Sequence, residues 1–419
     1  MGATETHLAI EAVWKIESAR LIAGLTRIVR DVGIAEELAQ DALVVALEKW
    51  PESGIPQNPG AWLMATAKHR AIDFLRRGSL IDEKHEMLGR EMAEREMQVP
   101  NLAAAMDDNI GDDMLRLVFI ACHPVLSAEA QVALTLRLLG GLSTDEIAHA
   151  YLVSEATMAQ RIVRAKKTLS DSHAPFEVPR GVEFSARLSS VLQVLYLIFN
   201  EGYSATAGDD WMRPTLCEEA MRLGRILVGL VPNEAEAHGL VALMEIQGSR
   251  SKARVNAAGD PILLLEQDRS KWDRLLIERG LAALARAEKL HTPRGPYVIQ
   301  AAIAACHARA FTAQETDWGR IADLYQELAA IQPSPVIELN RAVAVSMAKG
   351  ASAGLELIDA IKDDPALRGY HLLPSVRGDF LKKLGRTAEA RVEFERAASL
   401  SRNSKERNLL LERARSCSA

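Results

Sequence analysis

The sequence predicts an all-α protein in which two small helical domains precede a long series of helices. Apolar residues recur with helical periodicity along most of the 419 residues, and strand-like alternation with β-branched residues is scarce. The composition is 48% hydrophobic but only 5% aromatic, and Ala and Leu dominate it. Both residues favour helix because they lose little rotamer freedom there. Pro and Gly positions and shifts in charge divide the chain into four parts: 8–78, 79–112, 113–172 and 180–419.

The overall charge and hydropathy exclude several classes of protein. The formal net charge is −6, so any nucleic-acid binding must come from local basic faces. No run approaches 18 apolar residues, so no membrane span is expected. The first residues lack a basic stretch followed by an apolar stretch, so no secretion signal is expected either. We therefore expect a cytoplasmic protein.

Cysteine usage fits a reducing compartment. None of the four cysteines forms a CxxC pair, which indicates free thiols. Cys122-His123 and Cys306-His307 are adjacent pairs without zinc-finger spacing, so buried helix cysteines are favoured over metal ligands. We predict no metal site and no cofactor. The cysteines are Cys122, Cys217, Cys306 and Cys417.

Residues 35–50, AEELAQDALVVALEKW, predict the first helix of interest in the first domain. Two acids lie in its first turn, where the helix dipole favours negative charge. The stretch 42–47 is apolar on nearly every side, so the helix is expected to be largely buried. Its exposed residues are expected to be Glu36, Glu37, Gln40 and Asp41.

A strongly basic helix follows the loop PESGIPQNP and reads GAWLMATAKHRAIDFLRR. Asn58 followed by Pro59 predicts its start, with a capping residue and then proline in the first turn. Asp73 is the only acid between residues 68 and 77. The alternative to a nucleic-acid face is an ordinary charged helix end, since cations suit a C-terminus. The basic residues are Lys68, Arg70, Arg76 and Arg77.

Residues 79–112 form a charged, Met-rich segment that ends with four aspartates. It contains EKHEMLGREMAEREMQ and then MDDNIGDD. A solvated tether is the favoured interpretation, and a flexible acidic segment that threads a basic channel is the alternative.

The clearest local motif is a helix-turn-helix at residues 142–170, LSTDEIAHAYLVSEATMAQRIVRAKKTLS. Ser143 and Glu146 have the spacing of a capping box, and Ala148 is small where a second helix must cross closely. Ser154 can cap that second helix. Leu152 departs from the usual pattern, because many such turns place Gly there, so the turn is expected to differ slightly.

The second helix of this motif has two distinct faces. Four of its residues make one buried stripe, and the opposite face is basic, with four cations against Glu155 between 154 and 167. Such a helix suits the DNA major groove, with its N-terminal half at base edges and later cations at phosphates. The alternative is a solvated surface helix. The stripe is Met158, Ile162, Ala165 and Leu169; the opposite face is Thr157, Gln160, Arg161, Arg164 and Lys167; the fourth cation is Lys166.

Basic helix, linker and helix-turn-helix, in this order, resemble the extracytoplasmic-function (ECF) sigma factors of bacterial RNA polymerase over about residues 8–172. EELAQDALVVALEKW resembles their core-polymerase-binding helix, and GAWLMATAKHRAIDFLRR resembles the helix that melts and reads the −10 element. LSTDEIAHAYLVSEATMAQRIVRAKKTL resembles the region that reads the −35 element. HPVLSAEAQVALTLRLLGGLSTDEIA and FNEGYSA look like the ECF42 group, which carries a tetratricopeptide-like extension. Two cysteines commonly precede the His-Pro pair in that group, and Ala121 replaces the first here.

The resemblance implies roles by position. Residues 8–78 would form sigma region 2, and residues 113–172 would form region 4. The loop 52–58 would hold a flipped −10 base, whose extrusion costs a few kcal/mol. The polymerase clamp would be faced by Glu37, Gln40 and Asp41. The −10 contacts would be Lys68, His69, Arg70, Asp73, Arg76 and Arg77, and the −35 contacts Ser154, Thr157, Gln160, Arg161, Arg164 and Lys167.

Residues 180–419 predict tetratricopeptide-like helical repeats. The segments TDWGRIADLYQELAAIQP (316–333) and GRTAEARVEFERAASL (385–400) share the pattern, and Ile321 and Ala390 in them are 69 residues apart (390 − 321), about two periods of ~34. Leu355 falls between them. Such arrays offer a surface to proteins or peptides, so a partner of this kind is expected there. The alternative is that these helices only stabilise the first two domains.

The segment FNEGYSATAGDDWMRP, residues 199–214, gathers polar and aromatic residues in an expected loop. A ligand or contact site and a simple capped corner explain it equally well.

These features together predict a non-enzymatic transcription initiation factor. It would bind core RNA polymerase and promoter DNA, with its activity tuned by the extension and without membrane contact. The alternative is a DNA-binding regulator with a tetratricopeptide sensor that does not act as a sigma subunit, and such a regulator needs no clamp-binding helix. An enzyme is disfavoured because the sequence has no GxxxxGK[ST], no HExxH and no Ser or Cys nucleophile motif.

Overall fold

A computed structural model describes residues 3–86, 110–205, 211–257 and 259–417. These residues are helical as predicted, and their β pairing is limited to an isolated bridge between Val255 and Pro261. The chain divides into two compact units, 1–194 and 195–419. The linker expected at 79–112 is helical at both ends, because α3 (Pro59–Glu86) continues through Glu86 and α4 (Ile110–Ala121) begins at Ile110. Its remaining residues, 87–109, lie outside the described residues.

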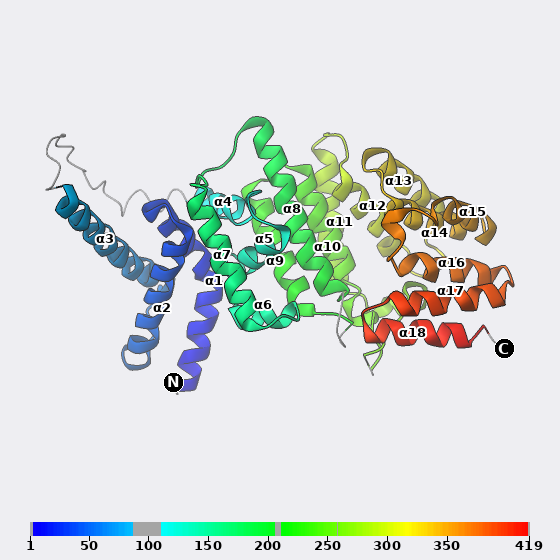
Figure 1. Ribbon diagram of the computed structural model, residues 1–419, viewed down its shortest axis with the longest axis horizontal. Coiled ribbons are helices and arrows are strands. Elements are labelled where there is room, and N and C mark those ends of the chain that lie inside the picture. Colours follow the sequence, from blue (N-terminus) through cyan, green and yellow to red (C-terminus); the bar gives the residue numbers. More distant parts are fainter. Residues whose placement is uncertain (1–2, 87–109, 206–210, 258, 418–419) are drawn as a thin grey trace. The chain divides into compact units, whose positions relative to one another are not determined.

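The first unit contains seven described helices and the start of an eighth (Figure 1). Their bounds are α1 (Ala3–Val29), α2 (Val32–Ser53), α3 (Pro59–Glu86), α4 (Ile110–Ala121), α5 (Ala128–Leu138), α6 (Thr144–Ala150), α7 (Glu155–Asp171) and α8 (Gly181–Tyr203). The basic helix α3 therefore continues through Glu86, eight residues beyond the end of the first domain expected from the sequence.

Helix α1 is the common support of the first unit. It packs against α2 and α3 on one hand and against α4 and α5 on the other. Trp50 at the end of α2 is fully buried and meets Trp62 of α3 edge to face, with ring centroids 5.3 Å apart. This contact closes the corner between α2 and α3 and fixes the loop 54–58 between them. Asn58 caps α3 as predicted, since its Oδ1 accepts from the Ala61 N–H at 3.1 Å.

Helix α8 is the one described helix that is long and apolar enough to cross a membrane. Val191 in the first unit and Phe199 in the second unit are nevertheless buried. Its composition therefore matches that of a core helix as well. Arg187 ties its first half to α4 within the first unit, because it donates to the Phe119 carbonyl at 2.8 Å.

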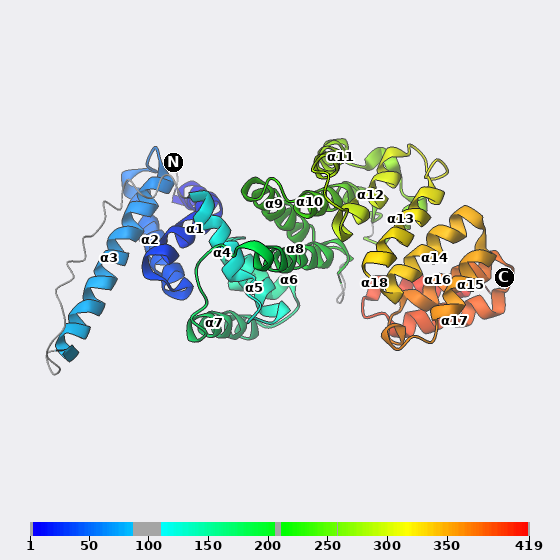
Figure 2. The same cartoon turned by 90° about the horizontal axis from the view of Figure 1, so that it is seen from above.

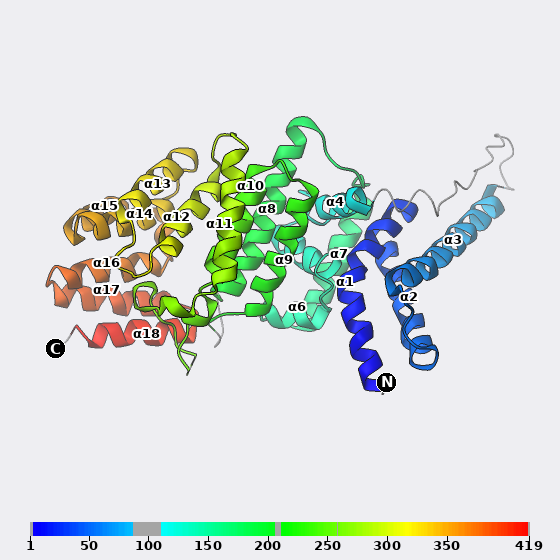
Figure 3. The ribbon, with the colours of Figure 1, turned by 180° about the vertical axis from the view of Figure 1, so that it is seen from behind.

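The second unit is a series of helices in which every consecutive pair from α9 to α18 packs together (Figures 1, 2 and 3). Gly239 allows a close approach of α10 to α12, because a Cβ there would lie 2.7 Å from the Val298 nitrogen of α12. The bounds are α9 (Pro214–Leu230), α10 (Ala235–Gly248), α11 (Arg274–Lys289), α12 (Pro296–Arg309), α13 (Trp318–Ile331), α14 (Pro335–Lys349), α15 (Ala351–Ile361), α16 (Leu372–Lys383), α17 (Thr387–Leu400) and α18 (Ser404–Arg415).

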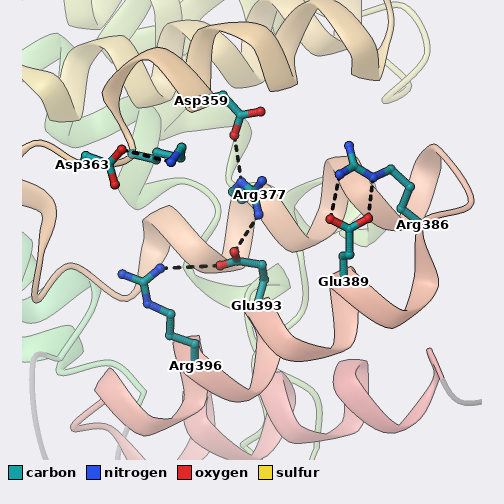
Figure 4. A network of polar contacts seen from close by, with 8 residues as sticks. Asp359, Asp363, Arg377, Arg386, Glu389, Glu393 and Arg396 are labelled. Atoms are coloured by element: carbon teal, nitrogen blue, oxygen red, sulfur yellow. Dashed lines mark hydrogen bonds and ion pairs between the residues drawn. The ribbon is translucent and has the colours of Figure 1, made fainter.

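Ion pairs fasten the last helices of this unit to one another (Figure 4). Arg377 of α16 donates to Asp359 of α15 at 2.9 Å and to Glu393 of α17 at 2.7 Å. The guanidinium therefore bridges three helices through two carboxylates. An arginine removed from water is stabilised when carboxylates accept hydrogen bonds from its guanidinium N–H groups, and Arg377 has two such carboxylates.

Candidate nucleic-acid interface

The predicted helix-turn-helix is present as α6 and α7. Ser143 Oγ accepts from the Glu146 N–H at 3.1 Å, and Glu146 Oε2 accepts from the Ser143 N–H at 2.7 Å, so the capping box is confirmed. Ser154 caps α7 and accepts from the Thr157 N–H at 3.2 Å. These two caps fix where both helices begin, and hence how α7 leaves the domain surface.

The two faces of α7 follow the sequence prediction. All four residues of the stripe, Met158, Ile162, Ala165 and Leu169, are buried. On the opposite face the side chains of Ser154, Thr157, Gln160, Arg164 and Lys167 are exposed, and Arg161 is half-buried. None of the described residues forms an ion pair with Arg161, Arg164 or Lys167. Three cations on one exposed face are therefore available to phosphates or base edges.

The turn between the helices contains Leu152 in an uncommon backbone conformation. Leu152 has φ +52°, the left-handed conformation that glycine adopts readily. Leu152 therefore adopts the backbone conformation that Gly would adopt at this position. The cost of this backbone conformation to a residue with a Cβ is about 1–2 kcal/mol.

A groove of about 720 Å³ lies between α2 and α3. Its lining includes all three residues predicted to face the polymerase, Glu37, Gln40 and Asp41, together with Arg70 and Asp73 from the predicted −10 set. Arg70 donates to Asp41 at 2.8 Å, and both side chains are more than a third exposed, so the pair contributes about 0–1 kcal/mol. The structure thus brings two sets of predicted contacts onto one surface.

The remaining members of the predicted −10 set lie elsewhere on α3. His69 and Arg76 are exposed and Lys68 is half-buried. Arg77 belongs to α3, but its side chain is not among those described. The buried stripe of α3 consists of Leu63, Ala67 and Ala71, which places the basic residues around the rest of the helix.

Two apolar residues of the groove were missed from the sequence. Val44 and Phe74 are exposed and line it beside Asp41 and Arg70. The sequence had predicted a helix that is apolar on nearly every side to be buried at 42–47, and Val44 is the exception. Exposed apolar side chains amid charges are typical of a protein contact surface.

Glu36 corrects a second expectation. It was predicted to be exposed in the first turn of its helix. Helix α2 instead begins at Val32, so its first turn contains no acid. Glu36 is buried, with 3% of its surface accessible. Its Oε1 accepts from Arg137 Nε of α5 at 2.7 Å and from Gln40 Nε2 at 2.8 Å, and its Oε2 is paired with Lys166 of α7. The α5–α7 side of the first unit therefore supplies two cations to one carboxylate of α2. The sequence spacing gave no signal of this contact, because Arg137 follows Glu36 by 101 residues.

Family models match three segments of the chain. Residues 17–80 match sigma-70 region 2, and residues 116–169 match sigma-70 region 4. Residues 187–288 match a family of unknown function, DUF6596. Region 2 thus covers the groove between α2 and α3, and region 4 covers the helix-turn-helix.

Similar proteins cover either most of this chain or about a third of it. An uncharacterized protein of Rhizobium meliloti (strain 1021) is 45% identical over 384 residues, which cover 91% of this chain and 89% of the relative. The chain belongs to the same family as this rhizobial protein. The ECF RNA polymerase sigma factors SigK of Mycobacterium sp. strains KMS and JLS are each 26% identical over 165 residues, covering 37% of this chain and 77% of the relative. The two sigma-70 domains and these relatives support a sigma-factor role of the ECF type for the first unit.

Proposed function

We propose that the chain is a non-enzymatic ECF sigma factor that binds core RNA polymerase and directs it to promoters with −10 and −35 elements. The observation that carries the proposal is the exposed cationic face of α7 within a region 4 match. Lys166, on the same helix, is paired with Glu36, whereas Arg161, Arg164 and Lys167 have no ion pair with any described residue. A face that keeps its cations unpaired suits a polyanionic partner.

The groove between α2 and α3 is the proposed polymerase contact. Glu37 and Asp41 offer acids at its edge, and Val44 and Phe74 offer apolar surface that a partner can cover. Arg70 lies at the boundary between this surface and the DNA-facing side of α3, since it is already paired with Asp41. Polymerase binding that engages Asp41 would release Arg70 for DNA.

Promoter binding requires regions 2 and 4 to separate. By their positions the −10 and −35 elements are about 25 base pairs apart, or about 85 Å at 3.4 Å per base pair. Helix α2 contacts both α3 and α7, yet its 22 residues span only about 33 Å. The pairs of Glu36 with Arg137 and Lys166 therefore have to open before α3 and α7 can occupy both elements.

The second unit is proposed to be a tetratricopeptide-like extension of the ECF42 kind that tunes this activity. Helices α13, α15 and α17 begin at Trp318, Ala351 and Thr387, which are 33 and 36 residues apart and so support a period of ~34. Truncation after Tyr203 tests the tuning while keeping Arg187 on its partner in α4. Unchanged activity in cells would argue against it.

Reconstituted transcription tests the central proposal. The purified chain is mixed with core polymerase and with DNA from upstream of its own coding sequence, and core binding and run-off transcripts are measured. We expect a stable complex and transcripts that depend on the chain. Absence of both core binding and core-dependent initiation would remove the sigma-factor proposal and leave a DNA-binding regulator.

Replacing Arg161 and Arg164 together by Ala tests the −35 contact. Affinity for −35 DNA should fall about tenfold or more, and the slope of log affinity against log salt should decrease by about 2. Core binding should survive. The matched control removes two exposed cations outside the interface, Arg180→Ala with Lys252→Ala, and should leave −35 binding unchanged. Loss of core binding in the first variant would contradict the assignment of α7.

A further inference from the structure

Three buried arginines gather in the second unit without an ion pair to any described carboxylate. Arg250, Arg254 and Arg269 are each at most 8% exposed, and none of them forms an ion pair with a described residue. They are close enough to affect one another, since the charge of Arg250 lowers the pKa of both neighbours after the larger effect of their burial. Burying like charges together is unfavourable unless each one finds partners.

Two of the three guanidinium groups donate hydrogen bonds to neutral oxygens. Arg254 donates to the Tyr203 carbonyl at 2.7 Å and stacks on the Tyr203 ring, 3.4 Å from its centroid. Arg269 donates to the carbonyls of His307 and Ala310 at 2.9 and 2.8 Å and to Thr316 Oγ1 at 2.9 Å. These two arginines hold the irregular segment after α10 against its surroundings.

Arg250 differs from both neighbours. Its side chain donates no hydrogen bond to a described residue, whereas Arg254 and Arg269 both do. The Nε of Arg250 is buried without a partner among the described residues, as is the Nε of Arg269. Only the rings of Tyr203 and Trp272 face its guanidinium among the described aromatic residues, at 5.7 and 5.8 Å from their centroids. Arg377, which fastens helices in the same unit, has two carboxylates (Figure 4). Arg250 makes no such link between helices.

Arg250 lines a cavity of about 430 Å³, a size that suits a small organic ligand. Helices α10, α12, α13 and α14 build its walls, and the lining contains no Asp or Glu. Amide and phenol groups such as Gln247, Asn340 and Tyr325 are interspersed with apolar residues such as Ile303 and Ile337. The cavity therefore combines one positive charge, several neutral hydrogen-bonding groups and an apolar wall.

His307 adds a neutral donor to this cavity. Burial, reinforced by the charges of Arg250 and Arg269, lowers the pKa of His307 to about 3. The imidazole is therefore neutral near pH 7, and its buried Nδ1 has no hydrogen-bond partner among the described residues. A neutral imidazole can supply one N–H to an acceptor without adding a second charge.

We propose that this cavity binds an organic monocarboxylate whose carboxylate pairs with Arg250 and whose apolar body packs on the Ile303 and Ile337 wall. One guanidinium matches one carboxylate in charge and in the geometry of its fork. A phosphate dianion fits less well, because it would need a second cation. The other two arginines of the cluster already donate hydrogen bonds to Tyr203, His307, Ala310 and Thr316. The carboxylate can come from a small free acid or from the C-terminus of a peptide.

Ligand binding is tested on the purified full chain in a buffer without carboxylates. The probes are 4-phenylbutyrate, its neutral amide, the tripeptide Ala-Ala-Phe as acid and as amide, and inorganic phosphate. We expect at least one acid to bind by calorimetry and to raise the melting temperature, with the matching amide inactive. Binding of the tripeptide acid alone would assign a peptide source, and binding of phenylbutyrate a small-molecule source. The test uses no polymerase, so it is independent of the sigma-factor proposal.

Arg250→Met separates a ligand site from a structural role. It should weaken binding of the active acid about thirtyfold or more, because a buried charge loses its partner. Without ligand it should leave the melting temperature unchanged or raise it, because an unpaired buried charge is removed. The matched control, Arg254→Met, should lower the melting temperature, since it frees the Tyr203 carbonyl. The proposal is overturned if no acid binds at millimolar concentration, if phosphate binds as well as the acids, or if Arg250→Met destabilises the chain as Arg254→Met does.

Discussion

Glu36 in the first unit and Arg250 in the second unit are both buried ions, with 3% and 8% of their surfaces exposed, but their surroundings are opposite. Glu36 has Arg137, Lys166 and Gln40 around its two oxygens. Arg250 has no carboxylate and no hydrogen-bond acceptor among the described residues. A buried ion whose partners are present holds elements together, whereas one whose partners are missing indicates where a ligand of opposite charge belongs.

Removing the carboxylate of Glu36 should have the largest effect. In Glu36→Gln two cations of the α5–α7 side lose their shared acid, and Arg137 and Lys166 are each only 21% exposed in their side chains. We expect the free energy of unfolding to fall by about 3 kcal/mol, measured by urea denaturation. The control on the same helix is Glu48→Gln, an exposed acid, which should change stability by less than about 0.5 kcal/mol. Equal effects of the two substitutions on stability would mean that the Glu36 carboxylate does not hold α2 to α5 and α7.

Helix positions and the faces of α7 followed from local rules in the sequence. Ser143, Glu146 and Ser154 act as caps because capping depends on residues three positions apart. The stripe from Met158 to Leu169 is buried because one helix face must cover the core. Such short-range patterns identify the exposed basic side of the helix without any knowledge of its neighbours.

Charge pairing across the chain did not follow from the sequence. Glu36 was expected in a first turn, where acids are favoured, but it lies beyond the first turn of α2. Its burial depends on Arg137 and Lys166, which the fold brings from far along the chain. Arg250 lies in SRSKAR, a stretch without any motif. It has no hydrogen-bond acceptor among the described residues, while nearby carbonyl oxygens accept hydrogen bonds from Arg254 and Arg269. Pairing of this kind depends on the three-dimensional arrangement, so it cannot be predicted from local sequence patterns.

The environment of Arg250 should also make stability depend on pH through His307. Its folded-state pKa of about 3 lies below the unfolded value of 6.5, so the unfolded chain takes up the proton first as pH falls. Stability from this group is complete above pH 6.5 and is lost as pH falls from 6.5 towards 3. At pH 5 the loss should be about 2 kcal/mol. We expect His307→Gln to show a smaller drop in unfolding free energy between pH 7 and pH 5 than the wild type, measured by urea denaturation at both values. An equal drop would mean that His307 is not held neutral beside the arginines.

Leu152 has an unfavourable backbone conformation, which, unlike the unpaired charge of Arg250, a ligand would not relieve. Its φ of +52° is costly for a residue with a Cβ, and the side chain is 53% exposed, so packing returns little. Leu152→Gly should therefore raise the free energy of unfolding by up to about 1 kcal/mol, after the greater entropy of glycine in the unfolded chain is subtracted. Leu152→Ala keeps the Cβ and is the matched control, expected to be no more stable than the wild type. If Ala and Gly gave the same change, the backbone at this turn would not be strained.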